Sequence, residues 1–142
     1  MTAQNSENMS MDTFLESWSG EDQPMRSWFQ LLYDKLKNME GVSCSFVARP
    51  GVSYSLRPRH VNQTTRELFA IVDVIDDDPE ERWLSVCFYG DMISDPEERG
   101  ELIPGGLAGS DGYCFDMFED DEVLAEYLAE RLDEAGRTAA QG

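Results

Sequence analysis

The chain has no acidic residue in one long segment, although acids are abundant elsewhere. Residues 41–66 contain no Asp or Glu and carry Arg49, Arg57, Arg59 and Arg66. The whole chain has 29 acidic and 11 basic residues and a formal net charge of −18. A surface this negative repels nucleic acid and anionic membranes. We therefore expect neither nucleic acid nor a membrane as a partner.

Histidine, cysteine and long apolar runs are also scarce. The chain has one histidine and three cysteines, and the cysteines show no CxxC or other metal-ligand spacing. Cys44, Cys87 and Cys114 each fall in a strand-like stretch, which predicts reduced thiols in the core and a cytoplasmic location. No stretch approaches the roughly 18 apolar residues that cross a bilayer, and the polar start of the chain is unlike a secretion signal.

The apolar pattern predicts one domain that contains both helices and strands. A chain of 142 residues is long enough for one hydrophobic core. Apolar residues recur at helical spacing over residues 24–40 and 121–135. Period-two alternation flanks Arg49-Pro50-Gly51-Val52, where Pro and Gly suit a type II turn. We predict an α+β fold, a mainly antiparallel sheet of about five strands with the N- and C-terminal helices packed on one face.

Two strongly apolar runs, residues 68–75 and 82–89, predict the central strands. The first is almost unbroken, as in a strand covered on both faces, and Asp73 is its exception. Residues 94–100 combine a cap, an early proline and acids, which predicts a brief helix. The glycine-rich residues 105–112 predict a loop before a last strand. Their spacing is not that of a phosphate-binding loop, so no nucleotide or other cofactor is expected.

The two ends of the chain are expected to lie outside the folded domain. Residues 1–20 are predicted as a flexible segment with a short helix, which would dock on its own domain or on a partner. That helix is indicated by four apolar residues on one helical face, Met11, Phe14, Leu15 and Trp18. The domain is expected over residues 21–136, and a flexible polar tail over residues 137–142.

The basic segment is the main candidate for a binding site. Its guanidinium groups would meet around a short loop, and their planar fork binds two oxygens of a carboxylate or phosphate. The candidate residues are Arg49, Arg57, Arg59, His60 and Arg66. The alternative is that these arginines neutralise acids of the same chain. No nucleophile motif of the GxSxG type accompanies the histidine, so no catalytic residue is predicted.

Two acidic clusters offer oxygen ligands for a hard cation. One is the turn that contains Asp76 and Asp78, and the other is a ridge on the last helix that includes Glu122, Glu126 and Glu130. The turn lacks the alternating spacing of an EF-hand, which favours a solvated turn. Like charges four residues apart destabilise an isolated helix. We therefore expect a positively charged group to face the ridge: an arginine of the same chain, a cation or a basic partner.

Four segments carry a family resemblance. They are Gly51-Val52-Ser53-Tyr54, residues 67–75, residues 82–89 and the helix that begins at Asp121. Together with the order of elements over residues 24–135, they resemble small bacterial YdhG-like domains of unknown function. That family has been likened to frataxin, which implies an α+β fold and a role in handling iron. The acidic ridge of frataxin lies on its first helix and adjoining strand, whereas here it lies on the last helix, so we carry over no site residue.

These features predict a non-enzymatic binding or adaptor protein that presents separate acidic and basic surfaces to another protein. The prediction depends on the charge segregation and on the lack of a catalytic constellation. The alternative is a cation-binding protein, for iron or another metal, that uses the acidic clusters. Further alternatives are an enzyme acting on an acidic small molecule through the arginines and His60, and mimicry of DNA by the acidic surface.

Overall fold

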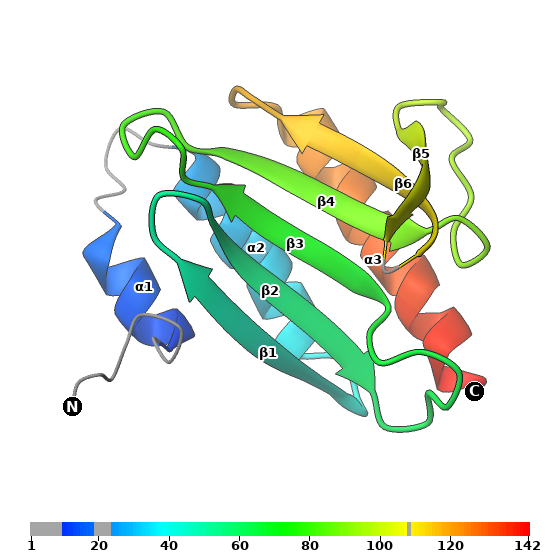
Figure 1. The fold of residues 1–142 in the computed structure, drawn as a ribbon. Helices are drawn as coiled ribbons and strands as arrows, with labels where there is room; N and C mark the ends of the chain where they lie inside the picture. Colours follow the sequence, from blue (N-terminus) through cyan, green and yellow to red (C-terminus); the bar gives the residue numbers. More distant parts are fainter. Residues whose placement is uncertain (1–9, 19–23, 108) are drawn as a thin grey trace.

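Six strands form one antiparallel sheet in the order β1-β2-β3-β4-β6-β5, shown in Figure 1. The computed structural model describes residues 10–18, 24–107 and 109–142. The helices are α1 (Met11–Ser17), α2 (Pro24–Lys37) and α3 (Glu122–Ala140). The strands are β1 (Val42–Arg49), β2 (Ser53–His60), β3 (Ala70–Ile75), β4 (Trp83–Tyr89), β5 (Glu101–Leu107) and β6 (Ser110–Met117). The α+β class and the antiparallel sheet are confirmed, but the sheet has six strands instead of about five.

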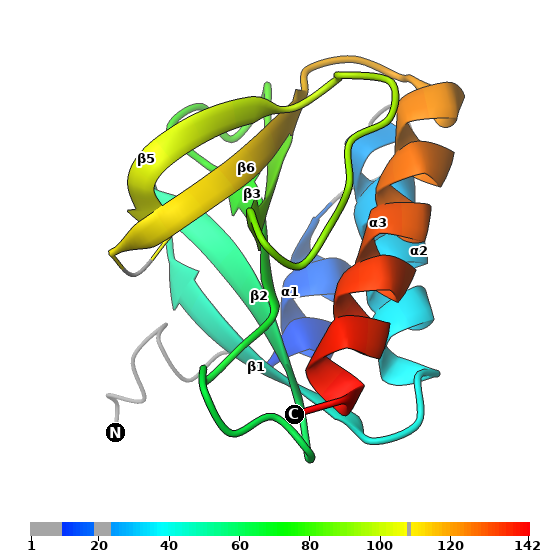
Figure 2. The ribbon, with the colours of Figure 1, turned by 90° about the vertical axis from the view of Figure 1, so that its right-hand side faces the viewer.

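The helices and the sheet form two layers. Figure 2 shows α2 and α3 against one face of the sheet, while β5 and β6 curve toward the other side. We call the opposite face the open face, because no helix of the described residues lies on it (Figure 2). The open face carries the odd-numbered residues of β1 to β4 and the even-numbered residues of β6, which the strand register places side by side.

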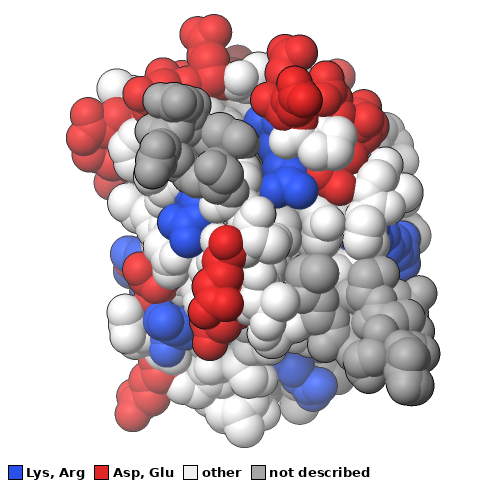
Figure 3. Space-filling model, turned by 90° about the vertical axis from the view of Figure 1, so that its left-hand side faces the viewer, with Lys and Arg blue, Asp and Glu red and all other residues white. Residues whose placement is uncertain are grey.

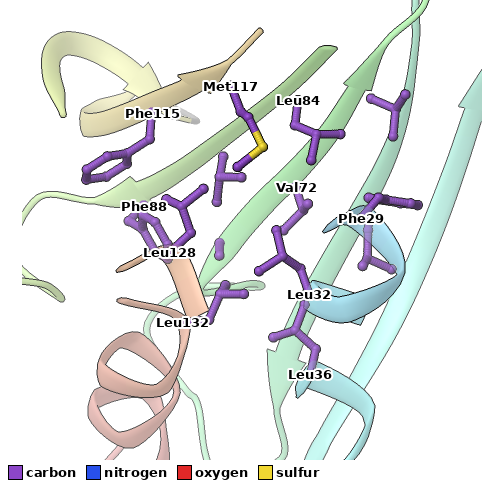
Figure 4. Close-up of a cluster of buried hydrophobic side chains, with 14 of the residues drawn as sticks. Phe29, Leu32, Leu36, Val72, Leu84, Phe88, Phe115, Met117, Leu128 and Leu132 are labelled. Carbon is purple, nitrogen blue, oxygen red and sulfur yellow. The ribbon is translucent and has the colours of Figure 1, made fainter. Parts of the chain in front are cut away.

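The hydrophobic core fills the space between the helices and the covered face. Val72 and Leu84 of the sheet and Leu32 and Leu132 of α2 and α3 are all 0% exposed, and Figure 4 shows them pointing toward one another. Residues of β3 alternate between buried and half-buried positions. The expectation that residues 68–75 form a strand covered on both faces is therefore wrong, because only the helix side is fully buried.

Helix α1 docks on its own domain through an aromatic cluster. Phe14 is fully buried and stacks on Tyr54 with ring centroids 4.1 Å apart. The guanidinium of Arg82 lies 5.5 Å from the Phe14 ring centroid, and Arg82 Nε lies 2.7 Å from Asp76 Oδ1. The other carboxylate oxygen, Oδ2, accepts a hydrogen bond of 2.7 Å from Gly51 N–H. One buried ion pair thus connects α1, the β1–β2 turn and the β3–β4 connection.

The β1–β2 hairpin has the turn that the sequence predicts. Val52 N–H donates to the Arg49 carbonyl at 2.8 Å, and Gly51 has φ of +85°. A positive φ at the third position is the requirement of a type II turn, and glycine meets it without steric strain. The register that follows pairs Ser45 with Arg57.

The brief helix expected over residues 94–100 is absent. Asp95 instead accepts hydrogen bonds from the backbone N–H groups of Arg99 and Gly100 and from the hydroxyl of Tyr127 on α3. Glu98 has φ of +52°, a left-handed conformation that a right-handed helix does not contain. The acids and proline of this segment therefore form a loop that is hydrogen-bonded to α3.

The expected glycine-rich loop belongs to a β-hairpin. Residues on both sides of the turn at Gly109 pair as β5 and β6, and the ladder is irregular between Ile103 and Leu107. Pro104 and two following glycines weaken the strand pattern in the sequence. This composition is why the sequence did not predict the strand β5.

Helix α3 is longer than predicted. It passes through Gly136 and ends at Ala140, so most of the expected tail, residues 137–142, is helical. A Cβ added at Gly136 would lie 3.1 Å from Met39 Sδ, which shows that this glycine permits close packing instead of ending the helix. Residues 1–9 of the segment expected to be flexible, and the domain boundary expected between residues 20 and 21, lie outside the described residues.

Candidate functional site

Three of the predicted arginines share the open face of the first hairpin. Alternation along β2 buries Tyr54, Leu56 and Pro58 on the covered side and places Arg57 and Arg59 on the open face. Arg49 of β1 lies on the same face, because it pairs with Ser53. We call these three residues, Arg49, Arg57 and Arg59, the arginine group.

A half-buried carboxylate lies beside the arginine group. Asp73 of β3 pairs across the sheet with Ser55, whose Oγ accepts a hydrogen bond of 2.9 Å from Arg57 Nε. Burial raises the pKa of Asp73, and the Ser55 hydroxyl and the charges of Arg57 and Arg49 oppose that rise. Among the described residues, buried Asp73 Oδ1 has no hydrogen-bond partner. The open face therefore combines positive charge with an incompletely satisfied acid.

Arg49 and Arg59 are the freest cations of the arginine group. Both side chains are exposed, and neither makes an ion pair with a described residue. An exposed guanidinium without an ion pair has its N–H groups available to bind a carboxylate or phosphate. Arg57 and Arg59 are two residues apart on β2, and Arg49 lies on the neighbouring strand, opposite Ser53. The arrangement suits several spaced contacts better than one compact anion pocket.

Arg66 and His60 do not join the arginine group. Arg66 donates to both oxygens of Asp91 at 2.7 and 3.1 Å, and its guanidinium lies 3.9 Å from the ring centroid of Tyr89. The hydrogen bond from Arg66 is the main cause that lowers the pKa of Asp91. Arg66 is therefore an internal partner of an acid, which is the alternative that the sequence left open.

His60 lies on the covered side of β2 and is 8% exposed. Its Nδ1 accepts a hydrogen bond of 3.0 Å from Asn62 N–H, and a Cβ at Gly41 would lie 2.8 Å from its Nε2. The imidazole therefore packs against the start of β1. It does not face the arginine group, so the expected cluster of four arginines and a histidine is only partly assembled.

Two of the three cysteines are joined across the open face. Cys87 of β4 and Cys114 of β6 are directly opposite in the register and form a disulfide. The prediction of reduced core thiols is wrong for this pair, because a short cross-strand distance brings the two sulfurs together. Cys44 is a free, half-buried thiol, and burial raises its pKa to about 11. The cytoplasmic location was inferred from three reduced cysteines, so that inference no longer holds, and the location stays a prediction.

The acidic residues considered for metal binding do not come together. Asp76 is 2% exposed, and its two oxygens already bind Arg82 and Gly51. Asp78 Oδ1 accepts a hydrogen bond of 3.1 Å from Glu80 N–H. Glu122, Glu126 and Glu130 are exposed along α3. Over residues 10–18, 24–107 and 109–142, no group of three His, Cys, Asp or Glu side chains is placed to hold a metal ion.

Sequence reasoning missed the partners that decide these roles. Asp91 follows β4 in a loop with no motif around it, so nothing marked it as the partner of Arg66. Phe118 and Trp83 lie with ring centroids 4.6 Å apart, although the sequence separates them by a hairpin. Asp73 is the residue of the candidate site that the sequence did mark, because a charged residue inside an apolar strand run is unusual.

Comparisons with protein-family models, curated proteins and solved structures find no match to this chain. Among the described helices, none combines the length and apolar content that crossing a membrane requires. The resemblance to YdhG-like domains stays a prediction.

Proposed function

We propose that this protein is a non-enzymatic binding module that receives an acidic segment of another protein on its open face. The observation that carries the proposal is the arginine group, in which Arg49 and Arg59 are exposed and make no ion pair with any described residue. These cations stand out in a chain of net charge −18. A partner that supplies carboxylates would satisfy them.

The spacing of the arginine group suits an extended segment. Arg57 and Arg59 are alternate residues of one strand, so their attachment points lie about 7 Å apart. Alternate side chains of an extended acidic peptide have the same spacing, which would place one carboxylate at each guanidinium. Arg49, on the neighbouring strand, would contact a residue farther along the peptide. A guanidinium fork gives each contact directional preference for a carboxylate.

The separation of His60 from the arginine group favours binding over catalysis. A general base must reach its substrate within hydrogen-bond distance, and His60 packs against Gly41 on the covered side. Arg66 lines a cavity of about 570 Å³ with Asp91 and Tyr113, away from Arg57 and Arg59. We therefore assign no catalytic residue.

The test is binding of a synthetic peptide with alternating glutamates, followed by fluorescence anisotropy. The salt concentration should be about 0.15 M, where the Debye length of about 8 Å screens long-range repulsion by the acidic chain. The test variant is Arg57→Ala/Arg59→Ala. The matched control is Lys37→Ala/Arg137→Ala. These two side chains are 51% and 73% exposed, and their substitution removes the same charge as the test variant does.

We expect the wild type and the control to bind with affinity that falls as salt rises. The test variant should lose most of the binding. Equal affinity of the two double variants, or no binding by the wild type at any salt concentration, would contradict the proposal.

A further inference from the structure

A cleft lined by aromatic side chains opens where the β3–β4 connection meets the β6–α3 connection. Its volume is about 360 Å³, and its lining includes Trp83, Phe118 and the first residues of α2. The two rings are in contact, with centroids 4.6 Å apart and planes tilted by 32°, yet Phe118 is 66% exposed. Two aromatic rings that are left accessible beside a hollow form an exposed apolar surface of the kind that marks binding sites.

Carboxylates surround this aromatic cleft. Glu80, Glu81 and Glu119 line it, all three are exposed, and none makes an ion pair with a described residue. Arg82 also lines the cleft, but its charge is paired with buried Asp76. Acidic side chains concentrate at this end of the molecule, at the top of Figure 3. The cleft therefore has an aromatic centre and an uncompensated negative rim.

Hydrogen bonds hold both sides of the cleft in place. Trp28 Nε1–H on α2 donates to Asp120 Oδ1 at 2.8 Å, which fixes the segment that follows Phe118. On the other side, Glu80 N–H donates to Asp78 Oδ1 at 3.1 Å. A site held in its binding shape loses less conformational entropy when it is occupied.

We propose that this cleft binds an arginine or lysine side chain from a basic segment of a partner protein. A cation over the face of Phe118 or Trp83 is attracted by the ring quadrupole, and the rim carboxylates add charge complementarity. A purely apolar partner would bury carboxylates without compensation, which is unfavourable. Among the described residues, no three acidic side chains are placed to hold a metal ion. The chemistry of the lining therefore selects an organic cation.

This inference goes beyond the proposed function, because it concerns a different region of the molecule, at one end of the open face, and a partner of opposite charge. Trp83 pairs with Ile75, which pairs with Ser53 of β2. Arg59 is six residues farther along β2, a distance of about 20 Å. The Arg57→Ala/Arg59→Ala variant therefore tests one region of this face, and variants of the cleft test the other.

The experiment measures binding of a fluorescein-labelled peptide that contains three arginines separated by glycine and serine. Phe118→Ala is compared with Val123→Ala, since Val123 is 64% exposed and lies outside the cleft. Glu81→Gln/Glu119→Gln is compared with Glu126→Gln/Glu130→Gln, which removes the same charge from the exposed side of α3. A peptide with citrulline in place of arginine serves as the uncharged probe.

We expect Phe118→Ala to weaken binding about 3- to 30-fold, the effect of one cation–π contact, and Val123→Ala to leave it unchanged. The Glu81→Gln/Glu119→Gln variant should bind more weakly than its control, and the citrulline peptide should not bind. Arg57→Ala/Arg59→Ala should bind the arginine peptide as well as the wild type does.

Three results would overturn the proposal. The first is equal binding by Phe118→Ala and Val123→Ala. The second is equal binding by the two double Gln variants, because attraction would then depend only on net charge. The third is self-association of the wild type that Phe118→Ala abolishes, since the occupant would then be a second copy of the chain.

Discussion

The covered and open faces of the sheet accommodate a buried carboxylate in opposite ways. Asp76 and Asp73 belong to the same stretch of chain, three residues apart. Asp76, on the covered side, has both oxygens bound by Arg82 and Gly51. Asp73, on the open face, has a buried oxygen without a partner among the described residues. Burial alone therefore does not reveal the role of an acid, whereas its hydrogen-bond partners do.

The largest expected effect comes from breaking the ion pair on the covered side. Asp76→Asn removes the charge that compensates Arg82 and should lower the free energy of unfolding by about 3–5 kcal/mol. Urea unfolding followed by tryptophan fluorescence measures it. Asp77→Asn, at the exposed neighbouring position, should change stability by less than about 0.5 kcal/mol. Similar effects of the two substitutions would show that the buried pair contributes little.

The second prediction compares adjacent residues of β4 that face opposite ways. Leu84 is 0% exposed, so Leu84→Ala should cost about 2–5 kcal/mol through lost burial and the cavity left behind. Ser85→Ala, on the half-buried open face, should stay within about 0.5 kcal/mol. The measurement is the urea midpoint at an unchanged m-value. An equally large effect at Ser85 would mean that the open face is packed as tightly as the covered one.

The third prediction concerns the disulfide of the open face. Cys87→Ser/Cys114→Ser should lose about 2–4 kcal/mol of stability, because the crosslink restricts the unfolded chain. Adding a reductant should bring the wild type to the stability of the double variant. In the unreduced, denatured wild type, alkylation followed by mass spectrometry should modify Cys44 alone. Labelling of all three cysteines would contradict the bridge.

The smallest expected effect is a gain in stability, whereas the preceding predictions are losses. Because burial raises the pKa of Asp73 in the folded state, the folded protein binds this proton more tightly than the unfolded chain. The stabilising contribution of protonated Asp73 is complete below the ordinary aspartate pKa and is lost as the pH rises through the raised folded value. Asp73→Asn should therefore be more stable than the wild type at neutral pH.

The measurement for Asp73 is the difference in unfolding free energy between Asp73→Asn and the wild type, taken from pH 3 to pH 8 by urea titration. The difference should grow in favour of the variant as the pH rises and then become constant. A difference that does not change with pH would contradict the assigned direction of the pKa shift.

The sequence predicted elements whose side-chain pattern and turn chemistry agree. The first hairpin was predictable because Pro50 and Gly51 suit one turn type and the flanking residues alternate. Strand β5 was not predictable, because Pro104 and its neighbouring glycines resemble a loop and only pairing with β6 makes them a strand. The last helix continues past residue 135, where its predicted pattern ended, for a similar reason: Gly136 packs against Met39 of another segment.

The candidate site also contains features that follow from local sequence pattern and features that depend on tertiary contacts. The shared face of Arg57 and Arg59 followed from period two, which is a local property of one strand. The pairing of Arg66 with Asp91 and the contact of Trp83 with Phe118 depend on loops and strands that meet only after folding. Residue types therefore indicated charge and chemistry, whereas the tertiary structure decided which charges are left for a partner.

The irregular ladder of β5 has a consequence for assembly between molecules. The sheet has two outer strands, β1 and β5. Pro104 lacks a backbone N–H, and the break between Ile103 and Leu107 disturbs the spacing of the rest, which makes that edge a poor template for a further strand. Growth of a continuous intermolecular sheet needs two competent edges on every molecule. Among the described strands, β1 alone offers a regular edge, so strand addition would end at a pair and would not extend into a fibre.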